Sequence, residues 1–220
     1  MGIWRDAFYD PVVFAREFLE IEPHDAQRKW LNNSTHKENL LATGNRWGKS
    51  TVQAIKLLHR CFFKTRDKKW DNVRHYNAVN VSITQDQASI VFNKAAALID
   101  GKYRIEPFIE GTKKTPFPTI IFKNGSTLQA RSSQNRGEYL LGNDYDYINF
   151  DEVAFELNAA YVVDSVLTMR LADREGMIDF CSTPNGRNWF YDKYMKLKDS
   201  SGGYVQGGDS RDNPAISKTY

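Results

Sequence analysis

Gly48, Lys49 and Ser50 end a short stretch of the chain whose residue types suit the binding of a phosphate group. Apolar, β-favouring residues precede the stretch and helical spacing of apolar residues follows it, so the sequence predicts a strand, a turn and a helix. In that arrangement backbone N–H groups and the helix N-terminus face an anion. Lys49 would reach the β- and γ-phosphates of a nucleotide, and Ser50 would give Mg²⁺ a hydroxyl ligand. The expected nucleotide-binding residues of this loop are Thr43, Gly44, Asn45, Arg46, Trp47, Gly48, Lys49, Ser50 and Thr51.

The usual phosphate-loop pattern has a glycine, four residues, and then Gly-Lys-Ser or Gly-Lys-Thr. Here Thr43 takes the place of the first glycine, and Gly44 comes one residue later. The alternative is an ordinary surface turn before an amphipathic helix. The predicted strand at residues 39–43 and the predicted helix at residues 50–63 favour the phosphate site.

A second candidate pair, Asp151 and Glu152, follows a β-favouring run at residues 147–150. Ligands of open α/β sheets bind at the carboxyl ends of the strands, so Asp151 is expected beside the phosphate loop. Asp151 would hold Mg²⁺ through water, and Glu152 would orient and deprotonate the attacking water. The alternative is an acidic start of the next helix, stabilised by the helix dipole. The phosphate loop upstream favours the catalytic interpretation.

Strands that alternate with helices predict an α/β fold, with a mostly parallel sheet and helices on both of its faces. Strands are expected at residues 39–43, 78–84, 147–150 and 177–182, and helices at residues 12–19, 25–31, 50–63, 86–99, 158–171 and 189–197. About a hundred residues separate Lys49 from Asp151, which suits P-loop NTPases of the RecA-like (ASCE) branch, with an extra strand between the motif strands and a glutamate base.

Two further segments complete the expected organisation. Residues 119–132 predict a β-hairpin around Asn124 and Gly125, inserted into the sheet or added to it in antiparallel orientation, because Asn-Gly is a strong hairpin-turn signal. The tail from Asp199 is rich in glycine, serine and aspartate and is expected to be a linker.

The composition is typical of one soluble intracellular domain. With 220 residues, 41% hydrophobic and 26% charged, the chain can bury a single core. No apolar run approaches the about 18 residues of a membrane span, and no signal peptide is evident. Cys61 and Cys181 lie in apolar surroundings and favour a reducing compartment. The net charge of +3 does not establish a nucleic-acid partner, and the basic clusters at residues 60–69 and 113–114 are phosphate-backbone contacts or solvated loops.

Several motifs together resemble the ATPase domain of the large terminase subunit of tailed bacteriophages. They are GNRWGKST at residues 44–51, YDYINFDE at residues 145–152 and DFCSTPNG at residues 179–186. PHDAQRKWL at residues 23–31 is similar to the family's adenine-recognising segment, in which Gln27 would bond the adenine edge. Ser182 and Thr183 resemble its coupling motif, which senses the γ-phosphate. Asp212-Asn213-Pro214 is similar to the segment that leads out of the ATPase domain.

The resemblance also implies an arginine that stabilises the transition state, in cis or from a neighbouring subunit. Arg46 is the cis candidate, although the family often has its arginine where Asn45 stands. For the trans role many members carry Arg-Gly shortly before the magnesium aspartate, where this chain has Leu141-Gly142, so Arg136 is the candidate and Arg131 the fallback. The expected catalytic residues are Lys49, Glu152, Arg46 and Arg136.

The resemblance implies Mg-dependent ATP hydrolysis that drives double-stranded viral DNA into a procapsid. ATP and Mg²⁺ are the expected cofactors. The expected partners are double-stranded DNA, the portal protein, the small terminase subunit and further copies of the chain, pentameric at work and monomeric in isolation, with no membrane. The expected location is the host cell cytoplasm, transiently on the procapsid. The alternatives are a helicase or translocase ATPase on free nucleic acid, or a nucleotide-dependent binding switch, which would not need Glu152.

The expected domain boundary follows from the same resemblance. Residues 1–210 form the P-loop ATPase domain, and residues 211–220 begin a linker toward a nuclease domain absent from this chain.

Overall fold

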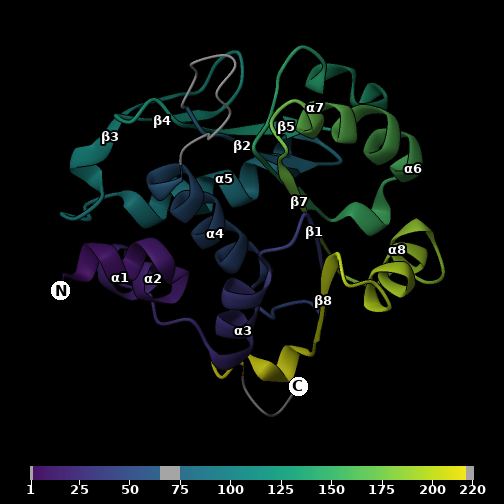
Figure 1. Ribbon diagram of the computed structural model, residues 1–220, viewed down its shortest axis with the longest axis horizontal. Coiled ribbons are helices and arrows are strands. Elements are labelled where there is room, and N and C mark those ends of the chain that lie inside the picture. The colour runs from purple at the N-terminus through teal and green to yellow at the C-terminus, as the bar shows by residue number, and fades with distance from the viewer. Residues whose placement is uncertain (1, 65–74, 217–220) are drawn as a thin grey trace.

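An eight-stranded sheet runs through the computed structural model, which describes residues 2–64 and 75–216 (Figure 1). The strands are β1 (Glu38–Thr43), β2 (Asn77–Ser82), β3 (Ile109–Lys113), β4 (Thr119–Phe122), β5 (Thr127–Ser132), β6 (Tyr147–Asp151), β7 (Met177–Ser182) and β8 (Gly203–Gly208). Their order in the sheet is β3-β4-β5-β2-β6-β7-β1-β8. The strands from β5 to β8 in this order run parallel, and β3 and β4 add an antiparallel edge. β7 lies between β6 and β1 in the sheet, so an extra strand separates the two motif strands β1 and β6, as the sequence predicts.

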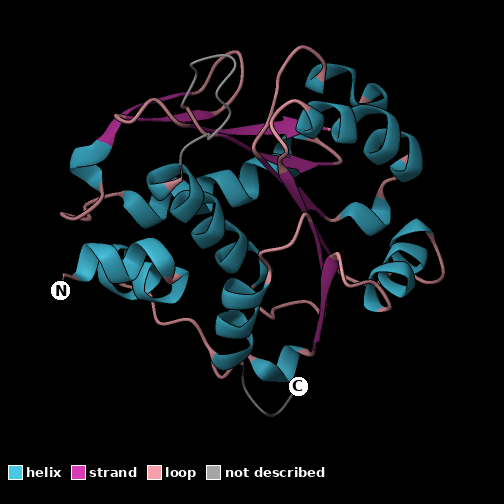
Figure 2. Ribbon diagram, viewed as in Figure 1, coloured by secondary structure: helices cyan, strands magenta, loops and turns pink. Residues whose placement is uncertain are grey.

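Helices cover both faces of the sheet, as the alternating pattern predicts (Figure 2). One face carries α1 (Ile3–Tyr9), α2 (Pro11–Leu19), α3 (Asp25–Asn33), α4 (Lys49–Phe63) and α5 (Gln85–Ile99). The other carries α6 (Ala159–Tyr161), the π-helical turn Val162–Leu167, α7 (Thr168–Ala172) and α8 (Trp189–Lys198). Short 3-10 turns lie at Glu106–Phe108, Asn135–Leu140, Val153–Phe155 and Ser210–Asp212.

The central strands are buried on both faces, which explains their nearly continuous apolar sequence. Every residue of β6 and of β7 is buried. Their register pairs Asp151 with Cys181, so the carboxyl ends of the two strands finish side by side. Ala42 of β1 pairs with Ser182 of β7, which brings the end of β1 to the same edge. The sheet therefore gathers the phosphate loop, Asp151 and the segment after Ser182 at one place.

The predicted hairpin is confirmed. β4 and β5 pair antiparallel around the turn at Asn124 and Gly125, and Gly125 has a φ of +85° that an L side chain rarely adopts. β5 also pairs in parallel with β2, so the hairpin extends the sheet. The sequence did not predict α1 or β3.

The expectation that the tail from Asp199 is a linker is wrong for residues 203–208, which form β8. This strand pairs in parallel with β1 along its whole length. Its glycines do not favour a strand in a sequence-based prediction, but the close packing around them requires glycine. A Cβ at Gly208 would lie 2.5 Å from Nε1 of Trp47, and one at Gly203 would lie 2.6 Å from a methyl carbon of Leu197.

Part of the basic cluster noted in the sequence, Arg66, Lys68 and Lys69, lies outside the described residues. Lys113 and Lys114 are exposed at the end of β3. Within residues 2–64 and 75–216, each helix is too short or too polar to cross a bilayer.

Candidate nucleotide site

The loop between β1 and α4 has the backbone geometry of a turn that closes onto a helix N-terminus. Gly48 precedes the helix with a φ of +100°, and Arg46 also has a positive φ, +62°. A Cβ at Gly48 would lie 2.5 Å from Nε2 of Gln27, so the position requires glycine for both conformation and space. At the start of α4, the N–H groups of Lys49 and Ser50 lack the intrahelical acceptor that later residues have, whereas the N–H of Thr51 donates to the carbonyl of Gly48 at 3.2 Å.

Lys49 stands at the centre of the site. Its Nζ donates to Oγ1 of Thr183 at 2.8 Å and to the carbonyl oxygens of Thr43 and Gly44 at 3.4 Å. The carboxylate of Glu152 lies 3.8 Å away. Lys49 is 8% exposed, so its ammonium is buried at the strand ends, and most of its contacts there are with neutral groups or are long. A phosphate would be a stronger partner for this charge than these groups are.

Glu152 and the coupling segment lie against each other. Oε2 of Glu152 accepts from Oγ of Ser182 at 3.2 Å and from the backbone N–H of Thr183 at 3.3 Å. Thr183 Oγ1, which accepts from Lys49, donates in turn to Oδ1 of Asn45 at 3.2 Å. Glu152 has a φ of +54°, an uncommon value for a residue other than glycine. One hydrogen-bonded chain therefore joins the phosphate loop, the lysine and the carboxylate.

Asp151 is buried beside α4 and is 6% exposed. Its Oδ1 accepts from Nε2 of Gln53 at 2.8 Å. Burial raises the pKa of Asp151 to about 6, although the hydrogen bond from Gln53 opposes the rise. Oε1 of Gln53 is buried and has no partner within the described residues.

The residues around Asp151 fit Mg²⁺. A carboxylate, an unpartnered amide oxygen of Gln53 and, one turn earlier on α4, the hydroxyl of Ser50 are hard oxygen donors of the kind that this ion prefers. An ion here would also relieve the burial of the carboxylate charge.

A cavity of about 580 Å³ opens in front of the loop, within the range of sites for small molecules. It is lined by Asn45, Arg46, Gly48, Lys49, Ser50, Thr51, Ile90, Asn93, Lys94, Ala97 and Glu152. The residues that α5 contributes, Lys94 above all, are missing from the sequence-based site. In the sequence they occupy ordinary exposed positions of a helix, and only the packing of α5 against α4 brings them to the cavity.

Some predicted binding residues brace the loop and do not line the cavity. Gln27 is 6% exposed, donates from Nε2 to the carbonyl of Gly48 at 3.2 Å and accepts from the N–H of His24. The Trp47 ring is fully buried, and Thr43 is buried at the end of β1. The contact of Gln27 with an adenine edge stays a prediction.

The segment after β8 holds the loop from the outside. The N–H of Gly44 donates to the carbonyl of Gly208 at 3.2 Å. Oγ of Ser210 donates to the carbonyl of Asn45 at 2.6 Å, and Nδ2 of Asn213 donates to the carbonyl of Arg46 at 2.7 Å. The sequence offered only the resemblance of residues 212–214 to an exit segment, with no sign of these contacts.

The three predicted arginines occupy different surroundings. Arg46 lines the cavity. Arg136 is exposed in a turn with a φ of +56°, and its guanidinium lies 6.0 Å from the ring centre of Tyr161. Arg131 is 6% exposed and stacks 3.6 Å from the ring centre of Phe117. Of these three candidates, Arg46 alone reaches the cavity from within the same chain.

Comparison with known proteins identifies the family of this chain. Residues 40–202 match the model of a protein family described as "Terminase large subunit, T4likevirus-type, N-terminal". The chain belongs to this family. The large terminase subunit of Thermus phage G20c is 24% identical over 192 residues, which cover 81% of this chain. The match covers 37% of that relative, so this chain spans well under half of its length.

Solved structures of the family share the fold. The large terminase ATPase domain of Thermus phage P74-26 superposes with a TM-score of 0.70 at 20% identity, over 88% of this chain and 83% of that chain. The large terminase of bacteriophage D6E in complex with ADP gives a TM-score of 0.65 at 18% identity, over 89% of this chain and 47% of that chain. At these identities the likeness shows the fold, and the predicted α/β fold with a mostly parallel sheet and helices on both faces is confirmed.

Proposed function

We propose that this domain binds ATP with Mg²⁺, hydrolyses it, and uses the hydrolysis to translocate double-stranded DNA into a procapsid. The observation that carries the proposal is the hydrogen-bonded chain through Asn45, Thr183 and Lys49, with Glu152 at 3.8 Å from the lysine. Membership of the terminase family supports the packaging role. The solved relative that holds ADP supports nucleotide binding.

Each group of the site has a role in this proposal. The loop N–H groups and Lys49 bind the phosphates, and Ser50 with Asp151 holds the ion. Mg²⁺, when bound, would neutralise part of the charge of the phosphates. Glu152 positions the attacking water and takes its proton. A γ-phosphate competes with Thr183 for the ammonium of Lys49, so Ser182 and Thr183 sense whether the phosphate is present.

The two exposed arginines divide the cationic roles. Arg46 serves the site of its own chain, because it lines the cavity. Arg136 lies on the surface and would serve the site of a neighbouring copy in a pentameric ring, formed from chains that are monomers in isolation. The portal protein and the small terminase subunit are the other proposed partners, in the host cytoplasm and on the procapsid.

The first test is Mg-ATP hydrolysis by the purified chain and by Glu152→Gln. We expect the substitution to lower turnover by about 10²- to 10⁴-fold, the contribution typical of a general base, with ADP binding unchanged. Glu138→Gln is the matched control, because Glu138 is an exposed glutamate outside the cavity. Turnover of Glu152→Gln at the rate of the unsubstituted protein would remove Glu152 as the base.

The second test measures specific activity against protein concentration in the unsubstituted protein, Arg136→Ala and Arg46→Ala. A shared site gives activity that rises with concentration and is lost in Arg136→Ala. Activity that is independent of concentration and is lost only in Arg46→Ala would contradict the trans role of Arg136.

A further inference from the structure

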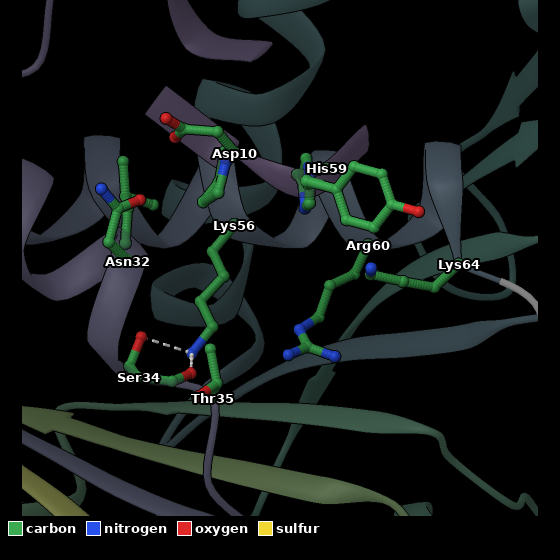
Figure 3. A pocket seen from close by; sticks show the side chains of 11 residues that line it. Asp10, Asn32, Ser34, Thr35, Lys56, His59, Arg60 and Lys64 are labelled. Carbon is green, nitrogen blue, oxygen red and sulfur yellow. Dashed lines mark hydrogen bonds between the residues drawn. The ribbon is translucent and has the colours of Figure 1, made fainter. Parts of the chain in front are cut away.

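A second cavity, of about 570 Å³, lies on α4 away from the nucleotide site and shares no lining residue with it (Figure 3). It is bounded by the junction of α1 and α2, the end of α3 and the second half of α4. The lining residues are Tyr9, Asp10, Pro11, Leu31, Asn32, Ser34, Thr35, Lys56, His59, Arg60 and Lys64. Its volume suits a ligand the size of a small phosphorylated molecule.

The cations of this cavity lie on one face of α4. Lys56, Arg60 and Lys64 are each four residues apart, a spacing that puts side chains on the same side of a helix. Figure 3 shows Lys56 and Arg60 extending from the helix in the same direction, with the Lys56 ammonium bonded to Ser34. Burial lowers the pKa of Lys64, and the nearby positive charge of Arg60 lowers it further because the two charges repel each other.

Two of these cations have no acidic partner among the described residues. Arg60 donates from Nη1 to the Tyr76 hydroxyl at 3.1 Å, and its guanidinium lies 5.3 Å from the ring centre of Tyr147. The ammonium of Lys64 lies 4.5 Å from the ring centre of Phe8. Both contacts are with neutral groups, and the acidic group that acts on Arg60 from further away, Asp179, pairs with Lys56.

The two acidic groups near the cavity, Asp10 and Asp179, already have hydrogen-bond or ion-pair partners. Asp10 accepts from the N–H of Val12 at 2.7 Å and caps α2. Asp179, behind the floor of the cavity, pairs with Lys56 at 2.5 Å. His59 adds no charge at neutral pH, because burial lowers its pKa to about 3, and its Nε2 donates to the carbonyl of Ala7. Among the described residues, the three cations Lys56, Arg60 and Lys64 outnumber the two carboxylates Asp10 and Asp179, so the cavity keeps an excess of positive charge.

We infer that this cavity binds a phosphate monoester dianion, with the Arg60 guanidinium and the Lys64 ammonium as its cationic contacts and the Thr35 hydroxyl as a neutral donor. Arginine offers a fork of donors that matches phosphate oxygens, and lysine adds a point charge. The recess suits a compact terminal phosphate better than the continuous backbone of a duplex. Inorganic phosphate, a small phosphorylated molecule and the 5′-phosphate of a DNA end all carry this chemistry.

The test is a titration of the isotope-labelled protein with inorganic phosphate, followed by the backbone amide signals of Thr35, Arg60 and Lys64. We expect these signals to shift both in the unsubstituted protein and in Lys49→Met, in which the phosphate loop is weakened. In Lys64→Ala and in Arg60→Gln, the dissociation constant read at Thr35 should rise about tenfold or more, as for the loss of a charge-assisted contact. Lys196→Ala, on the distant α8, is the matched control and should bind as the unsubstituted protein does.

The outcomes separate the sources of the phosphate. Shifts confined to Gly48, Lys49 and Ser50, or equal affinity in Lys64→Ala, would overturn the inference. Lys64 is half-buried at the helix end, so its substitution keeps the test valid even where Arg60→Gln fails to fold. A short oligonucleotide that carries a 5′-phosphate and competes with inorganic phosphate, when its unphosphorylated form does not, assigns the site to a DNA end. Binding of phosphate without such competition assigns it to a small molecule.

Discussion

Helix α4 carries two buried lysines, Lys49 and Lys56, which are two turns apart. Their ammonium groups differ in how well they are hydrogen-bonded. Lys56 donates from Nζ to the carbonyl and hydroxyl of Ser34 at 2.6 and 2.7 Å and pairs with Asp179 at 2.5 Å. Lys49 makes one bond of 2.8 Å, to Thr183, and its other contacts are 3.4 Å or longer. The first ammonium is saturated with short bonds, and the second is not.

The difference suits a structural role for Lys56 and the proposed phosphate-binding role for Lys49. Asp179, the partner of Lys56, also accepts from the Tyr147 hydroxyl at 2.6 Å and from Nδ2 of Asn39 at 2.8 Å. This network joins α4 to β1, β6 and β7. Burial lowers the pKa of Lys56 to about 8, while the Asp179 charge holds it up, so the ion pair persists at neutral pH. Lys49 lacks such a partner, and its charge remains available to a phosphate.

The largest expected effect on stability is that of Lys56→Met. Removing one partner leaves the charge of Asp179 buried and unpaired, so the free energy of unfolding should fall by about 3–5 kcal/mol. Urea denaturation at pH 7 measures this loss. The double variant Lys56→Met, Asp179→Leu should recover a large part of it, because neither charge is then left alone. A double variant that is less stable than the single one would contradict the assignment.

Lys49→Met is the same substitution on the same helix, but it should lower turnover strongly and stability only slightly. Turnover should fall by about 10²- to 10³-fold, as for the loss of one preorganised donor to a transition state. The free energy of unfolding should change by about 1 kcal/mol or less, because the ammonium gives up weak bonds. Steady-state hydrolysis and urea denaturation of both lysine variants sharpen the comparison. A large loss of stability in Lys49→Met would break it.

Asp151→Asn tests the buried carboxylate of the proposed ion site through pH. The folded-state pKa of about 6 lies above the unfolded value of about 3.9, so ionised Asp151 lowers stability above pH 6, and this cost disappears as the pH falls toward 4. The variant should therefore be more stable than the unsubstituted protein at pH 7, by about 3 kcal/mol at most, and the difference should shrink toward pH 4.

The same variant should also weaken the Mg²⁺ dependence of nucleotide binding. Urea denaturation at pH 7 and pH 5 measures the first effect, and ADP titration with and without the ion measures the second. Asp164→Asn, an exposed position in the π-helical turn, is the control and should show neither. If the unsubstituted protein is more stable than Asp151→Asn at pH 7, the predicted destabilisation by ionised Asp151 is contradicted.

The elements that carry strong periodic patterns could be predicted from the sequence. β1, α4, β6 and β7 combine apolar runs with motif residues, and Asn124 with Gly125 fixed the hairpin turn. β8 could not be predicted, because the glycines that its packing against Trp47 and Leu197 requires read as a linker. Local propensity is outweighed there by pairing with the free edge of β1.

The candidate site was predictable where one segment supplies it. The phosphate loop with Lys49, and Asp151 with Glu152, each lie within one short run of residues, and sheet topology brings the runs together. Lys94 and Gln53 could not be assigned, because their relevance depends on how α5 and β6 pack against α4. The contact of Gln27 with the adenine of a nucleotide stays a prediction, and the structure shows its amide bonded to the carbonyl of Gly48.

The bonds from Gly208, Ser210 and Asn213 to the phosphate loop have a mechanical consequence. Tension on the chain beyond Asn213 would act on the carbonyl groups of Asn45 and Arg46, whose neighbours are proposed to bind the phosphates. Because such coupling is reciprocal, a nucleotide that reshapes the loop must also change the force that the segment transmits. If the proposed site binds a nucleotide, its affinity should therefore depend on the force that pulls on the chain after Asn213.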